Sequence, residues 1–142
     1  LSAVQCPVLI VPSHYKSVSK LVLLFDGEPS SVYAIKMFSY MLPALKEHPT
    51  KVLSVKPMSQ SLHLPDNKLM REFMKRHFPK AVYKVMKGVP ETEIVNFLKD
   101  EKQSPLVVLG AYQRGMVSRW FRPSMADVLI KELKLPVFIA HN

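Results

Sequence analysis

The chain has 142 residues, of which 48% are hydrophobic and 22% charged, a balance that argues against disorder and suits one globular domain. No apolar run reaches the roughly 20 residues that a membrane helix needs, so no membrane association is expected. The formal net charge of +9 favours an anionic partner or a solvated basic surface, and the single cysteine excludes an internal disulfide and fits the reducing cytoplasm.

Five short apolar segments predict the strands of a sheet, in chain order 20–25, 52–55, 82–86, 106–109 and 137–140. The sequences LVLLF and LVVL within them are continuously apolar, as in strands buried on both faces of a parallel sheet. The third segment contains Lys84, so it is expected nearer to an edge.

The segment after the first strand has a helical pattern, with apolar residues every three or four positions between residues 34 and 45. Ser30 or Ser31 is the expected N-cap, and Pro43 is expected to kink or shorten the end of the helix. It is the first of four helices expected after the first four strands.

Three further helices continue this alternation. The second is basic, is capped by Asp66 and reaches about His77. The third has Pro90 in its first turn, and the fourth follows Ser124, with Asp127 completing a capping box. The alternation of strand and helix predicts an α/β layer fold with a parallel sheet and right-handed crossovers.

The amino-terminal segment CPVLIVP (6–12) repeats the pattern of LPVFIAH (135–141), near the end of the chain. Either two short apolar strands agree by chance, or residues 1–12 are the last strand of a preceding domain and 13–19 a linker. We adopt the second interpretation, with 1–19 as this remnant and linker and 20–142 as the main domain. Residues 8–11 are then expected to run antiparallel to 137–140, within one chain or exchanged between two.

Positive residues are densest between residues 68 and 87, where they alternate with apolar residues at helical spacing. The segment is either one solvated helix face or an anion-binding surface. We favour the solvated face, and a nucleic-acid partner is not expected because no RNA-binding aromatic motif or zinc-finger spacing is present.

The loop GAYQRGMVSRWFRPSMA (110–126) contains Gly110 and Gly115 at the spacing of a phosphate-binding P-loop. Met116 occupies the position where that motif requires lysine, which excludes a standard P-loop nucleoside triphosphatase. The five histidines are scattered and no hydrolase elbow is present, so neither a metal site nor a catalytic residue is predicted. Asp26, at the end of the first strand, is either a turn residue or a ligand acceptor beside the Gly110 loop.

Three stretches in this order resemble the universal stress protein family: LLFDGEPSSVYAIKMFSYML, VMKGVPETEIVNFLKD and PLVVLGAYQRGMVSRWFRPSMADVLIKELKLPVFIAH. The resemblance covers residues 20–141. It implies an open five-stranded parallel sheet in the order 3-2-1-4-5 with helices on both faces, to which the expected amino-terminal strand would be added at one edge. It also implies a homodimer or an intramolecular tandem that meets through the last strand. Some members bind ATP and others do not.

The ATP-binding branch of that family has the motif G-x-x-G, nine residues, then G-[S/T]. Gly110 matches the first glycine and Ser124 the final Ser/Thr, whereas Gln113 and Pro123 replace the second and third glycines. The resemblance also assigns adenosine contacts to Asp26 and Val55.

The two replacements weaken the phosphate site that the resemblance implies. Gln113 adds bulk where the backbone must approach phosphate, and Pro123 removes a donor before a helix N-terminus. Arg114 and its neighbouring arginines would supply part of the lost charge. Two lost charge-assisted hydrogen bonds correspond to about two to four orders of magnitude in affinity.

We therefore expect a non-catalytic stress-response or regulatory domain that acts through contacts with an unidentified protein. No cofactor is expected, and ATP binding is weak or lost. The alternative is a regulator that binds ATP or another adenine nucleotide and hydrolyses ATP slowly.

Overall fold

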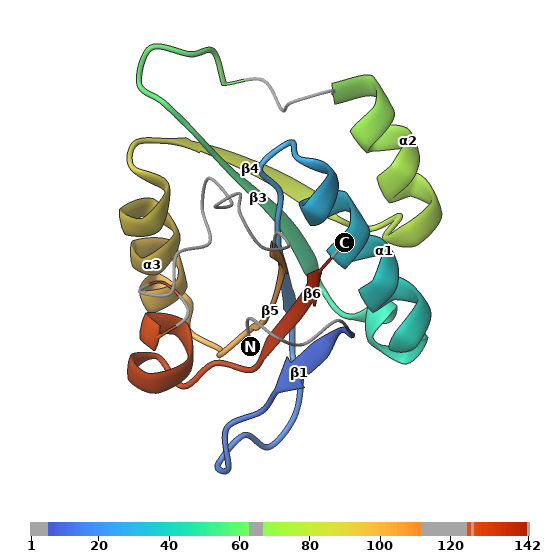
Figure 1. The fold of residues 1–142 in the computed structure, drawn as a ribbon, viewed down its shortest axis with the longest axis vertical. Helices are drawn as coiled ribbons and strands as arrows, with labels where there is room; N and C mark the ends of the chain where they lie inside the picture. Colours follow the sequence, from blue (N-terminus) through green and yellow to red (C-terminus); the bar gives the residue numbers. More distant parts are fainter. Residues whose placement is uncertain (1–5, 63–66, 112–124, 126, 142) are drawn as a thin grey trace.

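The structure of the protein is a computed structural model that describes residues 6–62, 67–111, 125 and 127–141. Its centre is one sheet of six strands in the order β1-β6-β5-β2-β3-β4 (Figure 1). The strands are β1 (Val8–Ile10), β2 (Leu21–Leu24), β3 (Thr50–Lys56), β4 (Val82–Lys87), β5 (Leu106–Ala111) and β6 (Val137–His141). The helical elements are α1 (Pro29–Met41), η1 (Pro43–Glu47), α2 (Asn67–His77), α3 (Pro90–Asp100) and η2 (Val128–Glu132).

The sheet is parallel except for its first strand. β2 pairs in parallel with β3 and β5, β3 with β4, and β5 with β6, whereas β1 is antiparallel to β6. The prediction of an α/β fold built on a mostly parallel sheet is confirmed. The sheet has six strands in all because β1 joins it, and from β4 to β6 the parallel strands stand in the chain order 3-2-1-4-5.

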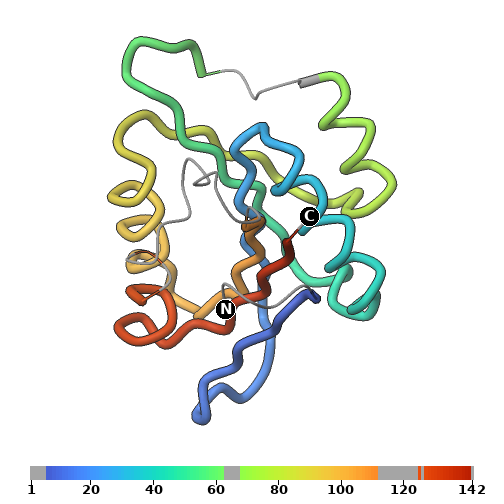
Figure 2. The backbone as a smooth tube through the Cα atoms, viewed as in Figure 1, coloured from blue at the N-terminus to red at the C-terminus, as the bar shows by residue number. Residues whose placement is uncertain are grey.

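β1 lies along the outer side of β6, with Val8 opposite Ile139 and Ile10 opposite Val137. The expected antiparallel pairing is therefore made, and it is made within the chain. Figure 2 shows the chain leaving β1 in a loop that turns back below the sheet and enters β2. Val11 was expected in this strand, but it lies beyond the ladder and its side chain is half exposed.

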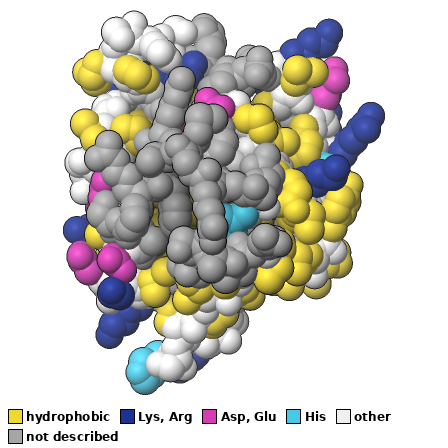
Figure 3. All heavy atoms as spheres, in the orientation of Figure 1, with side chains coloured by type: hydrophobic (Ala, Val, Ile, Leu, Met, Phe, Trp, Pro, Cys, Tyr) yellow, Lys and Arg dark blue, Asp and Glu magenta, His cyan; other side chains and the backbone are white. Residues whose placement is uncertain are grey.

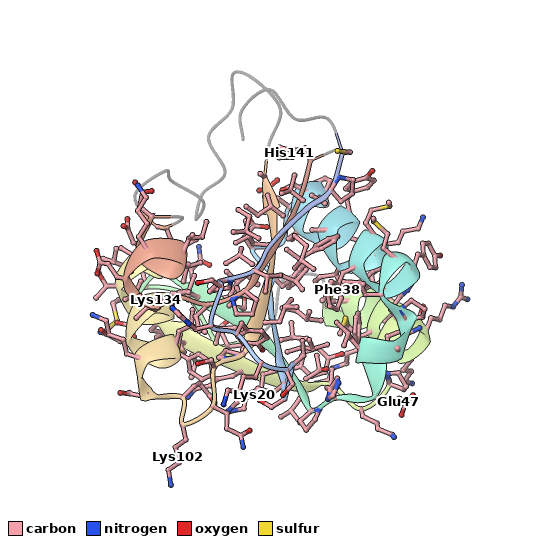
Figure 4. The ribbon with its side chains drawn as sticks, turned by 90° about the horizontal axis from the view of Figure 1, so that it is seen from below. Lys20, Phe38, Glu47, Lys102, Lys134 and His141 are labelled. Atoms are coloured by element: carbon pink, nitrogen blue, oxygen red, sulfur yellow. The ribbon has the colours of Figure 1, made fainter. Side chains whose placement is uncertain are left out.

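Helices cover both faces of the sheet, as expected (Figures 1 and 4). On one face, α1 and α2 pack around Phe38, whose ring centroid lies 6.2 Å from that of Phe78 and 5.1 Å from that of Phe138. On the other face, α3 and η2 bury Ile94 and Leu129 completely against the sheet. No helix in the described part of the chain is long and apolar enough to cross a bilayer.

The start of α1 differs from the prediction. The helix begins at Pro29, so Ser30 and Ser31 lie inside its first turn, where both are buried. The Ser31 hydroxyl donates to the backbone oxygen of Glu28 at 2.8 Å. Proline sets the backbone angle of a first helical position in advance, which explains why the helix starts before the serines. As predicted, Pro43 ends this helical segment, because η1 begins there.

As predicted, α2 ends at His77 and α3 begins at Pro90. The expected caps Asp66 and Ser124 lie outside the described residues. Asp127 makes no side-chain cap bond at the start of η2, and its carboxylate instead pairs with Lys131 at 2.9 Å.

Candidate functional site

The carboxyl ends of β2, β3 and β4 surround a cleft of about 460 Å³. The loops that follow these three strands form its walls. The lining residues are Asp26, Gly27, Glu28, Val55, Lys56, Pro57, Gln60, Gly88, Val89 and Pro90. Open α/β sheets bind small ligands beyond the carboxyl ends of their strands, so this cleft is the candidate site.

The turn after β2 fixes the carboxylate of Asp26 in the wall of the cleft. Gly27 has a φ of 88°, a conformation that L-residues with a side chain rarely adopt. This turn lets the backbone N–H of Glu28 donate to Asp26 Oδ1 at 2.9 Å. Asp26 is therefore a turn residue that also lines the cleft.

The walls from β3 and β4 are partly apolar. Val55 ends the buried part of β3 and is 4% exposed, and Val89 with Pro90 follows β4. The backbone N–H of Gly88 donates to the oxygen of Lys56 at 2.9 Å, which joins the loops after these two strands. An apolar wall of this kind can pack against a flat ring, while an acidic side chain across from it can accept hydrogen bonds from hydroxyl groups.

Gly110 lies near the end of β5, on the other side of β2 from the cleft, and it is not among the lining residues. A Cβ atom at this position would lie 2.2 Å from the backbone oxygen of Ser30. Glycine is therefore required here for the close approach of α1 to β5, which is a packing role. The sequence alone did not indicate this role.

The structure thus brings two predicted site residues, Asp26 and Val55, into one cleft and places Gly110 on the neighbouring side of β2. The other predicted ligand-binding residues, Arg114, Gly115 and Ser124, lie outside the described residues, as do Gln113 and Pro123. Sequence reasoning missed Gln60 and the segment 88–90. A glycine and a proline directly after a strand were the available signal for that segment.

A carboxylate that is hydrogen-bonded to two lysines lies at the opposite end of the sheet from the cleft. Glu101, which follows α3, accepts hydrogen bonds from Lys20 and from Lys51, the latter at 2.7 Å. Burial alone would raise the pKa of Glu101, but these two lysines lower it below its usual value. The described residues contain no group of three side chains suited to a metal ion.

No protein-family model and no curated protein sequence matches the chain. Solved structures do match its fold. The universal stress protein UspA from Lactobacillus plantarum is 14% identical with a TM-score of 0.64, and the match covers 88% of this chain and 99% of that one. A universal stress protein in complex with cAMP is 16% identical with a TM-score of 0.61, over 89% and 99% of the two chains.

A third match is a universal stress protein from Archaeoglobus fulgidus, 14% identical with a TM-score of 0.67. It covers 99% of this chain but only 51% of the other, so this chain spans about half the length of that protein. At these identities the comparisons establish the fold, and the chain has the α/β fold of UspA-like universal stress proteins.

Proposed function

We propose that this chain is a universal stress protein-like regulatory domain of the cytoplasm, which acts through protein contacts and without catalysis. Its cleft binds the nucleoside part of an adenine nucleotide, with little contribution from the phosphates. The observation that carries this proposal is the position of Asp26 and Val55 in the walls of one cleft at the carboxyl ends of β2 and β3.

The cleft suits a nucleoside on chemical grounds. The carboxylate of Asp26 is held by the N–H of Glu28 and can accept hydrogen bonds from ribose hydroxyls. The side chains of Val55 and Val89 offer the apolar surface that a base needs. One structural neighbour is a universal stress protein in complex with cAMP, which supports an adenine nucleotide as the class to test.

The affinity of the site for phosphate groups is expected to be low because of two residue replacements. In the resemblance to universal stress proteins, Gln113 and Pro123 stand where two glycines would let backbone N–H groups reach phosphate. Two missing charge-assisted hydrogen bonds correspond to about two to four orders of magnitude in affinity. The loss applies to the triphosphate and leaves the nucleoside contacts in place.

Calorimetric titration with adenosine, AMP, cAMP and ATP tests this proposal. We expect all four to bind weakly, with the affinity for ATP within about tenfold of that for adenosine, because the phosphates add little. Asp26→Ala should weaken adenosine binding by about tenfold. Asp100→Ala, which removes an exposed carboxylate at the end of α3, should leave binding unchanged.

Two results would refute the nucleoside-binding part of the proposal. Low-micromolar ATP binding without measurable adenosine binding would mean that the phosphate loop carries the affinity. Equal losses in the two alanine variants would mean that general charge, and not the cleft, attracts the ligand. Release of inorganic phosphate from ATP above the buffer rate would overturn the non-catalytic part.

The second candidate function is a regulator that binds ATP and hydrolyses it slowly, with Arg114 and its neighbours replacing the lost backbone donors. The excess of positive charge in the chain supports it, since the sequence has 20 Lys and Arg residues and 11 Asp and Glu residues. It predicts the opposite order of affinity, with ATP far tighter than adenosine, so the same titration separates the two functions.

We also propose that residues 1–19 form the last strand of a preceding unit plus a linker, and that 20–142 form the main domain. Two observations support this organisation. β1 has no helix between itself and β2 and serves only to extend the sheet at β6. The Archaeoglobus fulgidus protein covers nearly all of this chain with about half of its own length. Association through the last strand, in a dimer or a tandem, is part of this proposal.

A further inference from the structure

β4 is the last strand at one edge of the sheet. β4 pairs along its whole length with β3, from Val82 opposite Lys51 to Lys87 opposite Lys56. Among the described residues, no strand or loop donates to or accepts from its other side. Alternate N–H and C=O groups of a strand point to each side, so β4 presents a row of unpaired backbone groups.

This edge is longer than the edge at the other end of the sheet. β4 has six residues, whereas β1 has three. Six residues equal an average strand, enough for a partner strand to add a full ladder.

Basic side chains flank β4 on both faces of the sheet. On the α3 face, the Lys84 ammonium lies 4.7 Å from the centroid of the Phe97 ring. On the α2 face lies Lys87, which alternates along β4 with Tyr83 and Val85, two residues packed against the core on that face. A strand added to β4 would therefore meet positive charge on either side.

Basic residues are dense in the part of the chain that forms this edge, although the Glu93 carboxylate lies beside Gly88, the residue that follows β4. Between Asn67 and Lys87 the sequence has seven Lys or Arg residues and one acidic residue, Glu72. Figure 3 shows Lys and Arg side chains projecting along the α2 flank of the molecule. Lys80 has an exposed partner, Glu47, at 3.1 Å. Lys56 and Lys87 are register partners, and like charges side by side on neighbouring strands destabilise a sheet.

We propose that the β4 edge is a docking site for an extended acidic segment of a partner protein, which adds to the sheet as a seventh strand. Backbone hydrogen bonds would supply the register, and acidic side chains would pair with Lys84 on one face and Lys87 on the other. The inference rests on the protein-contact part of the proposed function. It is independent of the nucleotide cleft.

The same lysines argue against two other occupants. A second copy of β4 would bring together two strands that each carry Lys84 and Lys87, and lysines on an edge strand are a usual device against self-association. A nucleic acid would satisfy the charges but would leave the backbone groups of the edge unpaired. An acidic strand satisfies both the charges and the backbone groups.

Fluorescence anisotropy with labelled peptides and the full chain tests this site. The probe is a capped peptide of about six residues that alternates Glu and Val. Two matched peptides replace Glu with Lys, or place N-methylated residues at alternate positions so that no ladder can form. We expect only the first to bind, with affinity falling as salt rises. The backbone amides of β4 should also become protected from hydrogen exchange.

Charge-reversal variants locate the site. Lys84→Glu combined with Lys87→Glu should weaken binding of the acidic peptide by about tenfold or more. Lys16→Glu makes the same kind of change in an exposed residue beside the opposite edge and should change binding less than about twofold. Hydrogen exchange of the free double variant confirms that its sheet is intact.

Three results would overturn the proposal. The N-methylated peptide could bind as tightly as its parent, which would reduce the site to a charge effect. Lys16→Glu could weaken binding as much as the double variant. An RNA oligonucleotide could bind β4 more tightly than the peptide. Adenosine binding measured on the same samples keeps the two proposals apart, because loss of peptide binding with an intact cleft refutes only the docking site.

Discussion

Replacing Glu101 by glutamine should destabilise the fold at neutral pH by about 2 kcal/mol. The side chain of Glu101 is 9% exposed, and it accepts hydrogen bonds from Lys20 and Lys51, whose side chains are 17% and 43% exposed. Hydrogen bonds to charged groups contribute about 1.5–3 kcal/mol, but solvent screens most of the contribution of Lys51. Glutamine keeps one acceptor oxygen, so the loss is mainly that of the carboxylate beside the more buried Lys20.

The pH dependence follows from the direction of the pKa shift. Burial acts to raise the pKa of Glu101, and the two lysines lower it further than burial raises it. The unfolded chain therefore takes up a proton at this residue at a higher pH than the folded chain does. The stabilisation is fully present above the unfolded pKa of about 4.3 and is lost as pH falls through the lower folded pKa.

Urea unfolding of the wild type and Glu101→Gln at several pH values measures both effects. The difference in unfolding free energy should be largest above about pH 5 and should shrink as the solution becomes more acidic. Glu47→Gln is the matched control, because its pair with Lys80 is 80% and 75% exposed and should contribute less than about 0.5 kcal/mol. Equal losses in the two variants, or a Glu101→Gln deficit that does not change with pH, would refute the reasoning.

Three further predictions concern single residues. Gly110→Ala should lower the unfolding free energy by about 3 kcal/mol, because the new Cβ would lie 2.2 Å from the oxygen of Ser30; a loss below about 1 kcal/mol would contradict it. The pKa of His77 is lowered by burial and then by nearby lysine and arginine charges, so NMR titration should place its midpoint below about 6.5. Its contribution to stability is present above the unfolded pKa and is lost as pH falls through the folded one. Lys134→Gly should stabilise the fold by about 0.5–1 kcal/mol, measured as a higher melting temperature. Lys134 has a φ of 50°, a backbone conformation that glycine adopts more easily than lysine.

The strands were predictable where their residues are apolar and less so where lysines occur. Residues 52–55 were expected as the second strand, whereas β3 runs from Thr50 to Lys56. Lys51 hid the start because its charge is unusual in a parallel strand. Its long side chain carries the ammonium past the sheet to Glu101, where it is paired.

The candidate site was predictable only in part. Asp26 and Val55 came from the resemblance to a family, and the cleft contains both. The expected strand order already placed β4 beside β3, but the segment 88–90 was not assigned to the cleft, because a glycine and a proline after a strand are equally typical of a simple turn into a helix. The role of Gly110 was also hidden, since a glycine at the end of a strand looks the same whether it faces a ligand or the backbone of Ser30.

One edge of the sheet is formed by β1, which pairs with β6, and the other by β4. Deletion of residues 1–12 tests whether the two edges act independently. β1 pairs with β6 over only three residues, yet Ile10 packs against the core. Its removal should cost about 2–4 kcal/mol of unfolding free energy from partial burial of its apolar side chains, and it would expose the apolar strand β6. We therefore expect the deleted chain to change its oligomeric state in light scattering, while the acidic peptide still binds at β4. An unchanged mass and stability would mean that β1 is dispensable, which would refute the proposed association through the last strand. Loss of peptide binding would mean that the two edges are not independent.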